Sequence, residues 1–426
     1  MPDTIRIEIP YGDETVAFSV EARRLLGVFT PHEVPTLAEE ALDAELQRVL
    51  DAPIGAKPLR EAAKGARRVV IVADDATRPT PTHRIIPLLL DALNAAGVPD
   101  EAITVLIALG THRAMTEDEI ARKFGPAVTQ RVAVVNHDAF DPSQLVDLGI
   151  TPHGVTVQVN RRVIEADFVL GVGSIVPHHI PGFSGGAKII QPGVCGERTT
   201  GEVHLLSVRR ERSLLGVVEN PVRHEMEVIA ERAGLQAIFN TVLDSHGAVA
   251  GAVYGDPRTA FRSGVALSKR VYGVRVPHLA DIVVAGSHPC DSEFWQAHKT
   301  LYAAELCVRP GGTIIVVAPC PEGIAATHPD LTHFAGGSFE AIDAAICRGE
   351  ITDLTAGALA LAWANTRRRA TVALVSGGIS DEEARALGFV PYATVEEALA
   401  SALRRHGPEA TVSILPFAPD TLPLVE

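Results

Sequence analysis

The sequence predicts an α/β protein of two domains, each built from mostly parallel βαβ units. The chain has 426 residues, which is long for a single domain. Its residues are 46% hydrophobic but only 5% aromatic, and this composition suits the Val-, Ile- and Leu-rich strands of parallel sheets. Short apolar runs alternate with longer helical segments, which is the pattern of parallel βαβ units.

The first predicted domain covers residues 1–275. It begins with a β-hairpin whose strands, 4–10 and 15–20, flank Gly12 and Asp13. Apolar runs then predict buried strands at 68–73, 103–109, 131–135, 155–159 and 168–172. Helices are predicted near 37–50, 83–96, 116–124 and 218–233.

The second predicted domain covers residues 276–426. Strands are predicted at 282–285, 313–317 and 370–375, and helices near 294–306, 338–349 and 381–386. The segment 319–337 is rich in Pro, Gly and His and is predicted to be a loop. The last segment, 413–426, could pack on either the N-terminal or the C-terminal domain.

Charge and cysteine usage narrow the class of protein. The formal net charge of -14 argues against nucleic acid or an anionic membrane as a partner. The five cysteines are scattered without a C-x-x-C pair, as in proteins of a reducing compartment. The N-terminus lacks the apolar core of a signal peptide, and no apolar run approaches transmembrane length. We therefore expect a cytoplasmic protein.

Polar side chains follow the ends of several predicted strands. Asp74, Asp75 and Arg78 follow one strand, and His112 follows the next. The carboxyl ends of parallel strands meet at one edge of a sheet, where α/β proteins bind ligands. The loop ADDATRPTP could present Arg78 to a carboxylate or phosphate, or could be a surface turn with an Asp-Arg ion pair. His112 in GTHR could be a base or a structural histidine.

The densest motif runs from Val176 to His204 and reads VPHHIPGFSGGAKIIQPGVCGERTTGEVH. Its glycines allow close approach of the backbone to a ligand, and Lys188 could be a phosphate partner or a nucleophile. His204 is far enough along the chain to fold back as a metal ligand. Ile189 stands where a phosphate loop needs a hydroxyl residue, so the motif is not a P-loop.

A fourth motif, SHPCDSEFWQAHKTLYAAE, lies in the second domain. Trp295, Gln296 and Lys299 fall within one helical turn, because positions three and four apart share a face. An aromatic ring, an amide and an ammonium suit a planar anionic ligand. Alternatively, Trp295 docks the helix into the core of the domain.

Taken together, DDATRPTP, GTHR, PHHIPGFSGGAK followed by His204, and WQAHK resemble the nickel-pincer lactate racemase family. The motifs occur in the family's order from Asp74 to Lys299. The resemblance implies a two-domain α/β enzyme with its active site in the cleft between the domains. It also implies a cofactor made by separate maturation enzymes, the nickel-pincer nucleotide (pyridinium-3,5-bisthiocarboxylic acid mononucleotide).

The resemblance also implies roles for individual residues. Lys188 resembles the covalent attachment residue of the cofactor, and His204 resembles its nickel ligand. His112 and His178 resemble the acid/base pair, with His179 as the adjacent competitor of His178. Arg78 and Lys299 resemble the residues that contact the substrate. The cofactor contacts implied are Asp75, Ser184, Gly185, Gly186, Trp295 and Gln296.

The expected activity is inversion of C2 in a lactate-like 2-hydroxy acid by a racemase or epimerase. Removing the C2 hydrogen as hydride, while a histidine takes the hydroxyl proton, avoids a carbanion beside a carboxylate. Two other classes of function stay open from the residues: a zinc-type lyase or hydrolase using the same histidines, and a non-catalytic binder of nickel or a nucleotide. The sequence sets neither the particular 2-hydroxy acid nor the oligomeric state.

Overall fold

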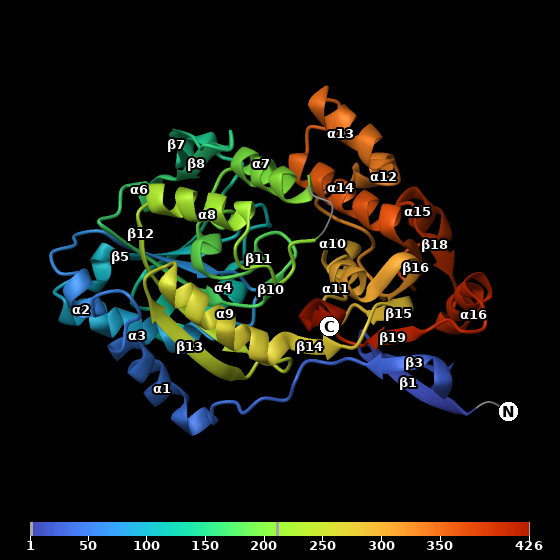
Figure 1. Ribbon diagram of the computed structural model, residues 1–426. Helices are drawn as coiled ribbons and strands as arrows, with labels where there is room; N and C mark the ends of the chain where they lie inside the picture. The colour runs from blue at the N-terminus through green and yellow to red at the C-terminus, as the bar shows by residue number, and fades with distance from the viewer. Residues whose placement is uncertain (1–2, 210–212, 426) are drawn as a thin grey trace. The chain divides into compact units, whose positions relative to one another are not determined.

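The computed structural model describes residues 3–209 and 213–425, which form two compact units (Figure 1). We call residues 33–203 with 216–271 the N-terminal unit. We call residues 1–32, 204–215 and 272–426 the C-terminal unit. Residues 3–32 therefore pack with the C-terminal half of the chain. The division predicted at residue 275 stays a prediction, since the compact units are built from interleaved segments.

The N-terminal unit is built around a six-stranded sheet in the order β13-β12-β9-β4-β5-β6. Neighbouring strands are parallel except for the β12-β13 pair. The strands are β4 (Val69–Asp74), β5 (Ile103–Ala108), β6 (Ala133–Asn136), β9 (Phe168–Ser174), β12 (Leu235–Leu243) and β13 (Val249–Gly255). Val69, Ile71 and Ala73 of β4 share one hydrophobic core with apolar residues of the helices α1 (Glu39–Asp51) and α3 (Thr82–Ala95).

Shorter elements complete this unit. The remaining helices are α2 (Leu59–Ala62), α4 (Glu117–Phe124), α5 (Pro126–Thr129), α6 (Arg161–Ile164), α7 (Glu197–Val208), α8 (Pro221–Arg232) and α9 (Thr259–Tyr272). Both α7 and α9 run on into residues of the C-terminal unit. Two antiparallel ribbons pair β7 (Leu145–Ile150) with β8 (Thr156–Asn160), and β10 (Pro177–His178) with β11 (Gly182–Phe183).

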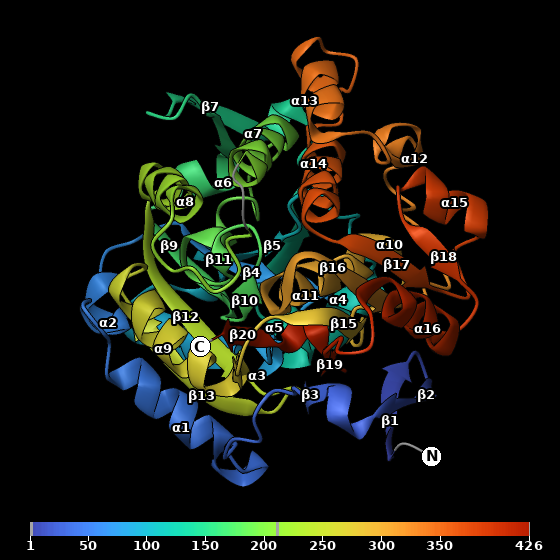
Figure 2. The same ribbon diagram turned by 45° about the vertical axis from the view of Figure 1, so that its right-hand side comes forward.

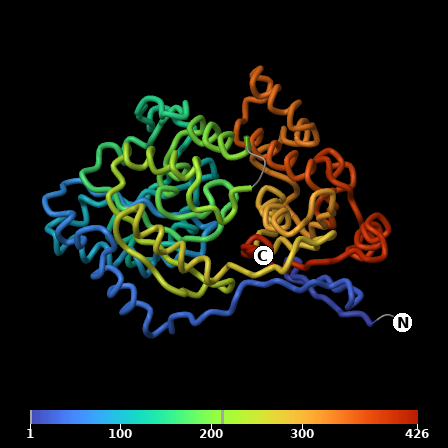
Figure 3. The backbone as a smooth tube through the Cα atoms, viewed as in Figure 1, coloured from blue at the N-terminus to red at the C-terminus, as the bar shows by residue number. Residues whose placement is uncertain are grey.

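The C-terminal unit has a six-stranded sheet, all parallel, in the order β18-β17-β16-β15-β19-β3. The strands are β3 (Leu25–Val28), β15 (Ala280–Gly286), β16 (Val308–Val317), β17 (Thr371–Val375), β18 (Val390–Tyr392) and β19 (Val412–Leu415). The N-terminal hairpin, β1 (Thr4–Tyr11) and β2 (Glu14–Glu21), packs its apolar face on this sheet. In Figure 3 this blue segment runs beside the red C-terminal one.

The helices of this unit are α10 (Phe294–Ala297), α11 (Thr300–Cys307), α12 (Leu331–Phe334), α13 (Phe339–Cys347), α14 (Leu354–Arg369), α15 (Asp381–Ala386) and α16 (Val395–His406). Figure 2 shows α13 beside α14. The last strand, β20 (Leu422–Val425), pairs in parallel with β14 (Gly273–Val276). The C-terminal segment thus packs within its own unit, beside the strand that opens the 272–426 segment.

The predicted fold class is confirmed, with local corrections. The strand predicted at 155–159 exists as β8, but it lies outside the parallel sheet and pairs antiparallel with β7. A tight turn causes this pairing, because Thr151 accepts a hydrogen bond at its hydroxyl from Val155 N and donates its own N–H to Val155 O. The helix predicted at 294–306 is divided into α10 and α11. None of the helices in the described ranges is both long and apolar enough to cross a membrane.

Candidate active site

A carboxylate and an imidazole meet at the carboxyl edge of the N-terminal sheet. Asp75 follows β4 and His112 follows the neighbouring strand β5, and His112 Nδ1 lies 2.6 Å from Asp75 Oδ2. Burial raises the pKa of Asp75, but hydrogen bonds from His112 and Thr77 outweigh it and hold that pKa well below its usual range. The ionised carboxylate fixes the proton of His112 on Nδ1 and leaves Nε2 as its basic nitrogen.

Side-chain hydrogen bonds and an ion pair hold the loop that carries Arg78 in place. Asp74 accepts a hydrogen bond from Thr80 at 2.5 Å and lies 3.3 Å from Lys123 Nζ. Lys123 also donates to the carbonyl oxygens of Arg78 and Thr80. Within the described ranges the Arg78 guanidinium reaches only Thr77 O, at 3.4 Å. The structure therefore pairs neither aspartate with Arg78, and its charge is available to an anion.

His137, which follows β6, is a structural histidine. Its side chain is 3% exposed and is bonded at both nitrogens: Nε2 to Cys195 O at 2.9 Å and Nδ1 to Asn160 Nδ2 at 3.0 Å. Burial lowers its pKa, so the imidazole is neutral. It supports the turn that follows the lysine motif.

The two adjacent histidines lie at the start of the glycine-rich loop. His178 of β10 faces Gly182 of β11, and its Nδ1 accepts a hydrogen bond from Ile180 N at 3.2 Å. The rings of His178 and His179 are stacked, with centroids 4.8 Å apart. The Ser184 hydroxyl donates to Ser174 O and accepts from Val176 N, so it fastens the loop to the end of β9. A cofactor contact of Ser184 stays a prediction.

Lys188 lies in the 3-10 turn η4 (Gly186–Ile189), which packs against β4, β9 and β12. Gly171 of β9 makes this packing possible, because a Cβ there would come within 2.6 Å of the Ile189 side chain. The G-x-G sequence in β9 therefore serves close packing of the lysine turn on the sheet. The predicted residues of this unit all lie in the chain segments that follow strands β4, β5 and β9: Asp75, Arg78, His112, His178 and Lys188.

A second group of predicted residues lies in the C-terminal unit. Trp295 and Gln296 are on α10, and Lys299 precedes α11 and donates from Nζ to Gln296 Oε1 at 2.5 Å. Trp295 is not the core tryptophan of this unit, because Trp363 is the fully buried one. Instead, the Trp295 ring stacks on His328, with centroids 3.8 Å apart and planes 18° from parallel.

His204, in the second half of α7, belongs to this same unit. Burial lowers the pKa of His298 well below its usual value, and the nearby charges of Lys299 and His204 lower it further. His204 therefore lies in the electrostatic neighbourhood of the residues that precede α11. The structure groups the predicted residues into two sets, one in each unit.

Comparison with known proteins assigns the family. Residues 11–216 match the lactate racemase N-terminal domain, and residues 276–420 match the lactate racemase C-terminal domain. The lactate racemase of Thermoanaerobacterium thermosaccharolyticum is 32% identical over 321 residues, which are 74% of this chain and 75% of the relative. That of Lactiplantibacillus plantarum is 31% identical over 323 residues, 75% of this chain and 76% of the relative. The chain belongs to the lactate racemase family.

Solved structures agree with this assignment. The lactate racemase apoprotein from T. thermosaccharolyticum superposes with a TM-score of 0.87 at 27% identity, covering 99% of this chain and all of that one. A protein from Thermotoga maritima, at 21% identity and a TM-score of 0.70 over 93% of this chain, shares the fold. As a member of the lactate racemase family, the chain is an isomerase with racemase function. Neither the hydrolase nor the non-catalytic alternative gains support.

Several residues that support the site carry no strong signal in the sequence. Asn220, Arg223 and Asn240 bind the backbone around the glycine-rich loop, and Asp353 holds His328 against Trp295. The Asn220-Pro221 pair is a recognisable helix start, since Asn220 caps α8 and Pro221 is its first residue. Arg223 carries no such signal, because its partners are backbone carbonyl oxygens.

Proposed function

We propose that the chain interconverts the enantiomers of a lactate-like 2-hydroxy acid, using a nickel-pincer nucleotide attached to Lys188. The observation that carries the proposal is the Asp75-His112 pair, which provides an oriented base beside the loops of Arg78 and Lys188. The family assignment supplies the reaction class. The five cysteines, all within the described ranges, form no disulfide there, which fits a reducing compartment, and we place the enzyme in the cytoplasm.

Two observations support the fit of such a cofactor. The side-chain amide of Gln191, three residues beyond Lys188, is fully buried, and neither of its polar atoms has a hydrogen-bond partner in the described parts of the chain. Buried groups in this state are usually satisfied by water or a ligand. Across those same residues, no three His, Cys, Asp or Glu side chains are grouped as a metal site. His204 as a single protein ligand suits a nickel ion whose other ligands come with the cofactor.

The two histidines are set up for complementary proton transfers. His112 offers an acceptor at Nε2, because its Nδ1 donates to Asp75. Neutral His178 carries its proton on Nε2, because its Nδ1 accepts from Ile180 N. His112 can thus take the substrate's hydroxyl proton at Nε2. His178 faces the other enantiomer with Nε2, and only its imidazolium form would give a proton from that nitrogen to the carbonyl oxygen of the keto acid. Inversion needs both, since the hydroxyl points to opposite sides in the two enantiomers.

Arg78 and Lys299 are proposed to hold the substrate carboxylate. Arg78 suits this role because a guanidinium can bind a carboxylate with two parallel hydrogen bonds. Lys299 is held in place by its hydrogen bond to Gln296. The chemistry that the bound cofactor would supply is that of a hydride acceptor for the C2 hydrogen, with Lys188 holding it covalently and His204 holding its nickel. Asp75 acts by orienting His112.

The intact mass of the protein tests the proposal. Chain produced together with the cofactor-making enzymes should carry an adduct that is absent from chain produced alone and absent from Lys188→Ala. In the same preparations, His204→Ala should keep the adduct but retain less nickel, because one ligand is lost. An unmodified chain with full racemase activity would contradict the proposal.

A further inference from the structure

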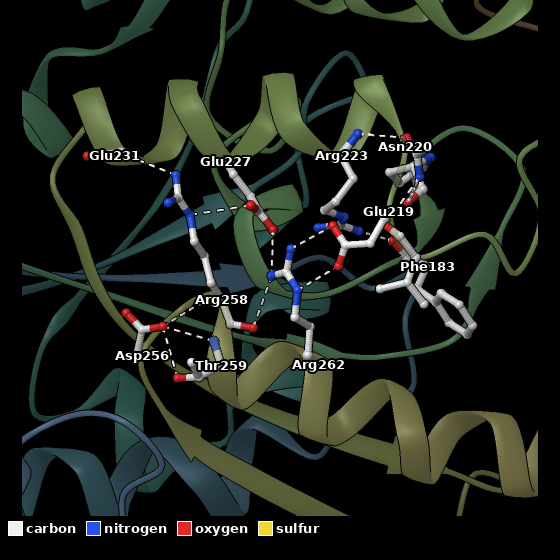
Figure 4. Close-up of polar contacts among 12 residues, drawn as sticks. Phe183, Glu219, Asn220, Arg223, Glu227, Glu231, Asp256, Arg258, Thr259 and Arg262 are labelled. Carbon is white, nitrogen blue, oxygen red and sulfur yellow. Dashed lines mark hydrogen bonds and ion pairs between the residues drawn. The ribbon is translucent and has the colours of Figure 1, made fainter.

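We propose that Arg223 is a positioning residue whose guanidinium grips the glycine-rich loop, residues 181–186, and thereby fixes Lys188. Arg223 lies on α8 and is 1% exposed. Its Nη1 donates to Gly185 O at 3.0 Å. Its Nη2 donates to Phe183 O (Figure 4). Gly185 O also accepts the backbone N–H of Lys188, at 3.2 Å. One carbonyl oxygen therefore joins the guanidinium directly to the lysine turn.

Two asparagines complete the grip. Asn220 Nδ2 donates to Pro181 O at 3.1 Å, and Asn240 Oδ1 accepts from Gly186 N at 2.9 Å. Backbone groups on both sides of Phe183 are thus bound by side chains of α8, of its N-cap residue Asn220 and of β12. Glycine-rich backbone loses much conformational freedom when it is ordered, and such fixed contacts provide that order.

The charges around Arg223 direct it to the loop. The nearest carboxylates are held by other arginines: Arg262 binds both oxygens of Glu219, at 2.8 and 3.0 Å, and also binds Glu227 at 3.0 Å (Figure 4). Burial lowers the pKa of Arg223 to about 9, so it stays protonated at neutral pH. A buried charge is costly unless it is hydrogen-bonded. Here two carbonyl oxygens accept hydrogen bonds from Nη1 and Nη2, while the buried Nε has no hydrogen-bond partner in the described residues.

Packing makes the connection stiff. The Arg223 guanidinium carbon lies 4.1 Å from the centroid of the Phe261 ring. That ring also lies against Gly186, where a Cβ would come within 2.9 Å of it and where φ is +57°. The Phe261 ring therefore contacts both Arg223 and Gly186. Gly186 is only two residues before Lys188. A change at Arg223 should reach Lys188 through this short path.

Amide hydrogen exchange of the chain without cofactor tests the grip. The variants are Arg223→Met, Arg223→Lys and, as a matched control, Arg258→Met. Arg258 is half-exposed and pairs with Glu227 and Glu231. Each is measured at the same interval below its own Tm. In Arg223→Met, peptides covering 182–190 should exchange at least about tenfold faster, because two charge-assisted hydrogen bonds are lost.

The same peptides should match the wild type in Arg258→Met. They should be intermediate in Arg223→Lys, since an ammonium can donate to a carbonyl but lacks the planar fork. Loop exchange in Arg223→Met equal to the wild type, or faster exchange spread equally over α3, would overturn the proposal. If Arg223→Met does not fold, wild-type exchange of the loop in Arg223→Lys overturns it.

A second measurement tests whether the hydrogen bonds of Arg223 to the loop affect cofactor attachment at Lys188, and it rests on the proposed function. The fraction of chain with an adduct on Lys188 should fall several-fold in Arg223→Met and stay at the wild-type level in Arg258→Met. Wild-type chain without any adduct would contradict the proposed function while leaving the exchange result to decide on Arg223. Normal adduct formation in a chain whose loop exchanges fast would show that Arg223 does not position Lys188.

Discussion

His112 Nδ1 lies 2.6 Å from Oδ2 of the buried carboxylate of Asp75. The carboxylate sets the tautomer of the imidazole, so Asp75→Asn should lower kcat by about 10²- to 10⁴-fold while leaving the fold intact. Racemisation assays from both enantiomers, with circular dichroism as a check of folding, measure this. The control is Arg113→Gln, since the neighbouring Arg113 forms an exposed ion pair with Glu119. Equal losses in the two variants would contradict a special role for Asp75.

The meeting of Asp75 and His112 could be predicted from the sequence. Each follows an apolar strand, and adjacent parallel strands bring their carboxyl ends to one edge. The contacts that hold the glycine-rich loop, residues 181–186, could not be predicted in this way. Strand β12 was missed because Asn240 and Thr241 interrupt its apolar pattern, and Asn240 is buried there to bind Gly186.

Two other features were also outside the reach of local patterns. Helix α14 is buried on nearly all sides, so it lacks the amphipathic period that reveals surface helices. The first 32 residues join the C-terminal unit because β3 pairs with β19, nearly 400 positions further along the chain. Such pairing depends on the tertiary structure and leaves no trace in neighbouring residues. The roles of Lys188 and His204 came from the family resemblance and stay predictions.

The adjacent histidines should differ under mutation. His178→Ala should cripple racemisation by about 10²-fold or more, because every inversion uses both acid/base residues. His179→Ala should have a smaller effect, since it removes the stacking partner of His178 and not the proton carrier. Initial rates from each enantiomer, measured at equal adduct content, make the comparison. Loss in His179→Ala with near-normal His178→Ala would move the role to His179.

The stacking of Trp295 on His328 predicts that segment 319–337, which the sequence predicts to be a loop, contributes to activity. His328 is bonded to Asp353 at 2.5 Å and supports one face of the indole. His328→Leu should lower kcat/KM by about twofold to tenfold, the value of one aromatic stack, and should change the Trp295 fluorescence. His333→Leu, an exposed position on the same segment, is the control. Unchanged fluorescence and activity in His328→Leu would contradict the prediction that His328 supports the Trp295 ring.

Isotope tracing separates hydride transfer from proton abstraction. A substrate enantiomer deuterated at C2 is allowed to racemise in ordinary water, and the product of opposite configuration is analysed by mass spectrometry. A hydrogen that stays on carbon throughout the reaction cannot exchange, so the product should retain most of its deuterium. If His112 or His178 removed the C2 hydrogen as a proton, the label would reside on an imidazole nitrogen and exchange with water between the two half-reactions. Extensive loss of deuterium would therefore refute hydride transfer, even if Lys188 and His204 proved essential.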